Sequence, residues 1–68
     1  MISDLSKYII AEMYGQDISQ EEMGMHLGIT QSTFSYRLKH NAFSYGDLLT
    51  IFSVLGTSDD MKVKLMTL

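Results

Sequence analysis

The chain has 68 residues, of which 46% are hydrophobic, and a formal net charge of −3. This length allows one domain, residues 1–68, and the hydrophobic content argues against disorder. Cysteine is absent, which excludes disulfides and thiolate metal sites, and no apolar run approaches the roughly 20 residues of a membrane span. Proline, the strongest helix breaker, is also absent.

Apolar residues recur at helical spacing and no segment alternates with a period of two, so the chain is predicted to be all-α with five helices. The first helix is expected at about 4–14, with Ser3 as its cap. The second is expected to begin at Ser19, where "SQEE" predicts a capping box with Glu22. It should end at Gly28, because glycine enters a left-handed conformation without a Cβ penalty.

The remaining three helices follow the same signals. A third helix is expected after the cap Thr30 and to about Lys39. "SYGD" predicts the start of a fourth helix at Ser44, and Gly56 predicts its end. "SDD" places two acids at the positive end of a short fifth helix, expected to fill 58–68.

The second and third predicted helices are separated only by Gly28, Ile29 and Thr30. Two helices joined by so short a glycine turn must cross steeply, which is the geometry of a helix-turn-helix. Gly24 is small where the two helices must pass closely. Apolar residues stand where this unit packs on itself and on the first helix: Met23, Leu27, Ile29 and Phe34.

Charge is distributed unevenly along the chain. The 24 residues Met23–Gly46 contain no Asp or Glu, and the formal charge is −4 for 1–29, +2 for 30–46 and −1 for 47–68. The outer face of the third helix is expected to carry hydrogen-bonding side chains without an acid: Gln31, Ser32, Ser35, Tyr36 and Lys39. This pattern indicates a surface that lies against something negative.

The stretch "SQEEMGMHLGITQSTFSYRL", with "FSYGDLLTIFSVLG" downstream, resembles the phage-repressor class of helix-turn-helix proteins, the Cro and Xre family. The resemblance implies a five-helix bundle of the lambda-repressor-like type that binds double-stranded DNA. It also implies that Gln20 contacts a phosphate and that the third helix reads base edges. The glycine frequent in the family after that helix is His40 or Asn41 here.

Residue chemistry agrees with these implied roles. Glutamine can bond adenine bidentately, a serine hydroxyl can serve several bases, and cations hold phosphates without reading sequence. We expect base reading by Gln31, Ser32, Ser35 and Tyr36. We expect phosphate contacts from Gln20, Arg37, Lys39, His40, Asn41 and Lys7.

The fifth predicted helix carries a second set of apolar residues. Met61, Leu65 and Leu68 form one stripe that can close the core, whereas Val63 and Met66 are expected to point away from it. An apolar second face on a surface helix marks a contact. The apolar pair Val63 and Met66 therefore predicts a symmetric homodimer that binds a near-palindromic operator. The alternative is that the C-terminal segment is a frayed tail whose apolar residues are incidental.

The expected function is therefore a DNA-binding transcriptional regulator, a repressor of phage type, in the cytoplasm and at the nucleoid of a bacterial host. No enzyme activity, cofactor, metal, membrane contact or small-molecule ligand is expected, because no phosphate loop, cysteine nucleophile or metal-site spacing is present. One alternative is a protein-interaction module, such as an antirepressor, antitoxin or adaptor, which the negative net charge favours slightly. The other alternative is a plain three-helix core that binds no ligand.

Overall fold

A computed structural model describes residues 3–67 of the chain. These residues form five helices and no strand. They are α1 (Asp4–Gly15), α2 (Gln20–Leu27), α3 (Gln31–His40), α4 (Tyr45–Leu55) and α5 (Asp59–Met66). The predicted all-α fold with five helices is confirmed, with differences only at the helix ends. None of the described helices is long and apolar enough to cross a membrane.

Each helix begins after a hydroxyl side chain that accepts a hydrogen bond from a backbone N–H three residues later. The predicted caps Ser3, Ser19, Thr30 and Ser44 are confirmed, and α5 begins after Ser58 in the same way. Such a cap satisfies one of the free amides at a helix start. Among the described contacts, the reciprocal carboxylate bond of a capping box is formed only in α4, so the box predicted at Ser19 is half present.

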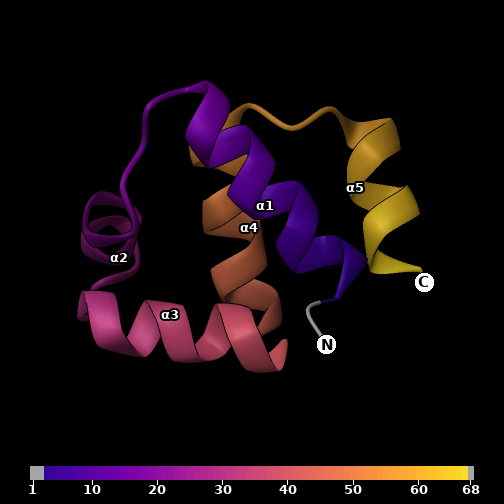
Figure 1. The fold of residues 1–68 in the computed structure, drawn as a ribbon. Coiled ribbons are helices and arrows are strands. Elements are labelled where there is room, and N and C mark those ends of the chain that lie inside the picture. Colours follow the sequence, from indigo (N-terminus) through magenta and orange to yellow (C-terminus); the bar gives the residue numbers. More distant parts are fainter. Residues whose placement is uncertain (1–2, 68) are drawn as a thin grey trace.

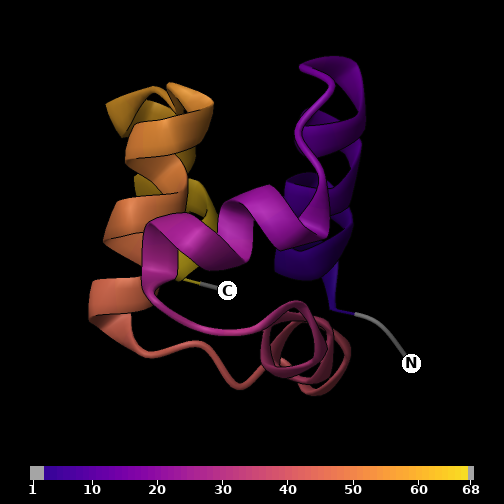
Figure 2. The same ribbon diagram turned by 90° about the vertical axis from the view of Figure 1, so that its left-hand side faces the viewer.

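The second and third helices cross steeply, as the short turn predicts. Figure 1 shows α2 nearly end-on while α3 runs across the view, and Figure 2 shows the reverse. Gly28 between them has φ 72°, which confirms the predicted left-handed conformation. This geometry sets α3 at the edge of the molecule, with one long side free.

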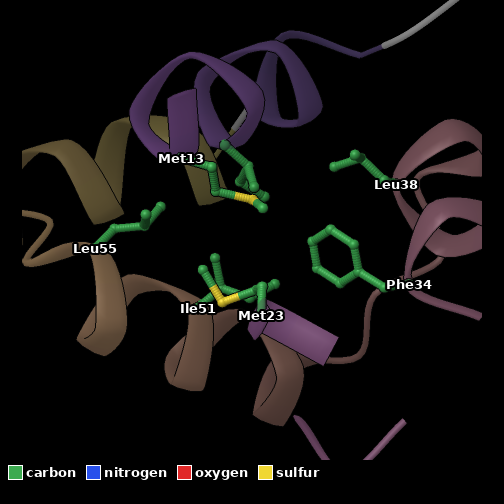
Figure 3. Close-up of a cluster of buried hydrophobic side chains, with 7 residues drawn as sticks. Met13, Met23, Phe34, Leu38, Ile51 and Leu55 are labelled. Carbon is green, nitrogen blue, oxygen red and sulfur yellow. The ribbon is translucent and has the colours of Figure 1, made fainter. Parts of the chain in front are cut away.

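The hydrophobic core lies where four helices meet. Phe34 and Met23 are completely buried and come from the two helices of the helix-turn-helix. In Figure 3 their side chains point toward those of α1 and α4. The cluster consists of Ile9, Met13, Met23, Phe34, Leu38, Ile51 and Leu55. The core therefore fixes α2 and α3 relative to the rest of the chain.

Side-chain hydrogen bonds attach α1 at both of its ends. The hydroxyl of Ser6 donates to the carbonyl oxygen of Leu38 at 2.6 Å, and Nε2 of Gln16 donates to the carbonyl oxygen of Leu55 at 2.9 Å. α5 is held more loosely: none of its residues is buried, although Met61 and Leu65 of the predicted stripe are half-buried. The third residue of that stripe, Leu68, lies outside the described residues.

Candidate nucleic-acid interface

The free side of α3 is polar and carries no acid. Phe34 and Leu38 are buried, whereas Gln31, Ser32, Tyr36, Lys39 and His40 are exposed. Because buried residues on one side hold the helix, the exposed side chains stand on a rigid support. The predicted exposure of Gln31, Ser32, Tyr36 and Lys39 is confirmed, whereas Ser35, which was predicted on the same outer face, is half-buried. The roles of these residues in reading bases or binding phosphates stay predictions.

Tyr36 and His40 form a pair one helical turn apart. Their ring centroids are 4.4 Å apart with a tilt of 39°, and Tyr36 is 61% exposed. The contact restricts the rotamers open to the tyrosine, because one side of its ring is already covered. A predicted base reader and a predicted phosphate contact thus form one packed unit on the free side of α3.

Ser35 is turned toward α2 and is half-buried. Its hydroxyl donates a hydrogen bond to Oε1 of Gln20, the first residue of α2. The bond uses the amide oxygen of Gln20 and leaves the Nε2 donors for another partner. Sequence reasoning placed Ser35 among the base readers and did not foresee this link, which joins it to a predicted phosphate contact.

Arg37 is engaged inside the chain. Its Nη1 donates to Oδ2 of Asp47 in the first turn of α4 at 2.9 Å, and the two side chains are 32% and 18% exposed. The predicted phosphate contact therefore already has a carboxylate partner. Sequence reasoning missed Asp47, although a signal exists: it is the first acid after the acid-free run and lies ten residues after Arg37.

The end of α3 meets the start of α1. Asn41 adopts a left-handed conformation with φ 53° and its N–H donates to the carbonyl of Arg37, so it takes the place of the family's glycine. The hydroxyl of Ser3 donates to Oδ1 of Asn41 at 3.3 Å. The exposed Lys7 follows Ser6, which bonds Leu38. Lys7 thus belongs to the part of α1 nearest the end of α3.

The basic side chains of the helix-turn-helix are concentrated at the C-terminal end of α3. Glu21 and Glu22 are exposed in the first turn of α2, where they oppose a phosphate at that helix start. The last turn of α3 instead carries Arg37, Lys39 and His40. Among the described residues, no group of three or more acidic or histidine side chains could hold a metal ion.

The two residues of the predicted dimer contact are not equivalent. Val63 is 64% exposed, whereas Met66 is half-buried and lines a hollow of about 400 Å³ with Leu5, Phe43 and Leu48. The last turn of α5 faces the start of α1 and α4, so the flexible methionine folds toward apolar neighbours. The spacing predicted that Met66 is exposed like Val63, and this part of the prediction is wrong.

Comparison with known families identifies the fold. The model of the bacteriophage CI repressor helix-turn-helix domain matches residues 10–60, which include the whole of α2, α3 and α4. Searches of curated proteins and of solved structures found no match. The matched span is well over half of the chain and confirms the phage-repressor resemblance. The chain belongs to the bacteriophage CI repressor helix-turn-helix domain family and is a DNA-binding regulator of that general type.

Proposed function

We propose that the chain is a sequence-specific transcriptional regulator, a repressor of phage or prophage type, that binds its operator with α3 in the major groove. The observation that carries the proposal is the free side of α3, which is exposed, rich in hydrogen-bonding groups and without an acid although the chain has a net charge of −3. An acid-free helical face suits the negative surface of a DNA groove. Such a protein would act in the cytoplasm of a bacterial host.

Individual roles follow from residue chemistry. Gln31 and Ser32 stand exposed in the first turn of α3, where a helix in the major groove presents side chains to base edges. Gln31 would bond adenine through both its amide oxygen and nitrogen. Gln20 would donate from its free Nε2 to a DNA phosphate. Lys39 would contact the DNA backbone on the other side of the major groove.

A dimer is the arrangement that would let this small domain read a full operator. The longest axis of one protomer is 29 Å, whereas half-sites lie about 34 Å apart, one DNA turn. One protomer therefore reads one half-site. We infer a symmetric pair that meets through α5, where Val63 offers an exposed apolar side chain, on a near-palindromic operator.

An electrophoretic shift with fragmented phage and host DNA at two salt concentrations tests the proposal. We expect selected fragments to shift in the presence of excess competitor DNA and the shift to weaken as salt rises. A second candidate function, binding of a protein partner, is favoured by the net charge of −3 and by the exposed Glu21 and Glu22. Absence of any shift at the lower salt would overturn DNA binding in favour of that candidate.

A further inference from the structure

Helix α3 has two permanently charged cations, and one of them is paired with an acid within the chain. Arg37 and Lys39 are the only Lys or Arg residues of α3. Both are within one turn of the exposed Tyr36, so both are in reach of a DNA backbone that borders this helix. The guanidinium of Arg37, however, is bound to Asp47 at 2.9 Å.

The carboxylate of Asp47 is held in place independently of Arg37. Its Oδ2 accepts from the N–H of Ser44 at 3.2 Å, and its own N–H donates to the Ser44 hydroxyl at 3.1 Å. Exposed ion pairs are weak partly because pairing orders two mobile side chains. Here the capping box has already ordered the acid, so forming the pair costs less conformational entropy.

The other ion pair of the described residues shows the contrast. Lys62 and Asp59 lie 3.5 Å apart on α5, and the side chain of Asp59 is 97% exposed. The side chain of Asp47 is only 18% exposed, so water screens its pair with Arg37 much less. The Arg37–Asp47 pair is therefore the one able to persist when the domain approaches DNA.

We propose that Asp47 competes with DNA phosphates for Arg37 and thereby limits the non-specific affinity of this domain. A carboxylate and a phosphate are the same kind of partner for a guanidinium, so a phosphate gains Arg37 only by displacing Asp47. The inference rests on the proposed DNA-binding function and makes Asp47 a residue that sets affinity without touching DNA.

Neutralising Asp47 tests the inference. Asp47→Asn keeps an oxygen that can accept from the N–H of Ser44, so the helix cap is retained while the charge is lost. Freed Arg37 adds one phosphate contact, which steepens the salt dependence of binding by about 0.9 in log–log slope. Affinity for a non-specific duplex should then rise roughly five- to tenfold at about 0.1 M salt, and the gain should vanish near 1 M.

A double-mutant cycle separates this mechanism from a general effect of charge. Wild type, Asp47→Asn, Arg37→Met and the double variant are titrated with a labelled duplex of random sequence, read by fluorescence anisotropy across a range of salt. In the Arg37→Met background, Asp47→Asn should have a much smaller effect. Asp60→Asn, which removes an exposed acid from the first turn of α5, is the charge control.

The outcomes distinguish two failures. If the wild type binds DNA and Asp47→Asn acts equally with and without Arg37, the inference is wrong and the proposed function stands. If none of the variants binds any DNA, the proposed function is wrong and the inference with it. Circular dichroism checks that each variant is helical. Should Asp47→Asn melt early, Asp47→Gln repeats the test, because glutamine also serves in capping boxes.

Discussion

A Cβ atom added to Gly24 would lie 2.9 Å from the carbonyl oxygen of Ile29, and the N–H of Ile29 donates to the carbonyl of Gly24 at 2.9 Å. In the middle of α2, the helix therefore touches the backbone of its own turn. No side chain fits between the two, and a backbone carbonyl has little freedom to move aside.

Gly24→Ala is expected to destabilise the domain, because the added methyl group overpacks a backbone contact at a cost of about 1–3 kcal/mol. This loss should exceed the gain of roughly 1 kcal/mol that alanine brings to a helix interior. Urea unfolding followed by circular dichroism measures it. Gly46→Ala is the control, since its Cβ would meet nothing closer than 3.9 Å, and equal stability of the two variants would contradict the packing argument.

Gly28→Val is expected to cost about 1 kcal/mol or more. A Cβ at this position meets no atom within 4 Å, so the cost comes from the left-handed backbone with φ 72° and not from a clash. Gly28→Asn should cost clearly less, because asparagine tolerates this conformation, as Asn41 does with φ 53°. Thermal melting ranks the three proteins, and asparagine ranking below valine would refute this account of the turn.

Gln31→Ala and Lys39→Ala are expected to weaken DNA binding in different ways. Loss of a bidentate contact from Gln31 should cost about 1–3 kcal/mol at one base pair and change the preferred sequence, and Ser32→Ala should also alter preference. Lys39→Ala should weaken binding to all sequences alike and lower the salt slope by about one unit. Selection from random oligonucleotides measures preference. Unchanged selection by Gln31→Ala would show that α3 docks in another orientation.

Ser35→Ala is expected to act through Gln20. Without the hydroxyl, the amide of Gln20 loses the bond that orients it, so binding should weaken similarly for all sequences. Adding Ser35→Ala to Gln20→Ala should then have little further effect. Competition titrations with two unrelated duplexes measure this. A change in preferred bases with Ser35→Ala would instead support the base-reading role predicted from the sequence.

Val63→Asp is expected to abolish the dimer while the monomer stays helical, since it places a charge on the exposed apolar residue of α5. Met66 is left unchanged because it is half-buried and its replacement would disturb folding. Sedimentation at operator-saturating concentrations measures the state of the protein. Ser53→Asp, at an exposed position of α4, is the control for added charge. A wild-type monomer with one protomer per duplex would disprove the proposed dimer.

Features that depend on contacts within one or two helical turns could be predicted from the sequence. The five hydroxyl caps, the left-handed Gly28 and the order of the helices follow from local hydrogen bonding and from the spacing of apolar residues. The helix-turn-helix follows in turn, because a glycine turn this short leaves little choice of crossing angle. The absence of acids from the exposed surface of α3 could be predicted as well, because no residue of Gln31–His40 is Asp or Glu.

The partners of individual polar side chains were decided only by the tertiary structure. Ser35 bonds Gln20, Ser6 bonds Leu38 and Arg37 bonds Asp47, and each pair joins two different helices. Periodicity says which side of a helix a residue occupies, but not which neighbour packs against that side. Met66 shows the same limit: its spacing pointed it outward, and the approach of α1 and α4 to the last turn of α5 left it half-buried, because a flexible apolar side chain packs against whatever apolar surface is near.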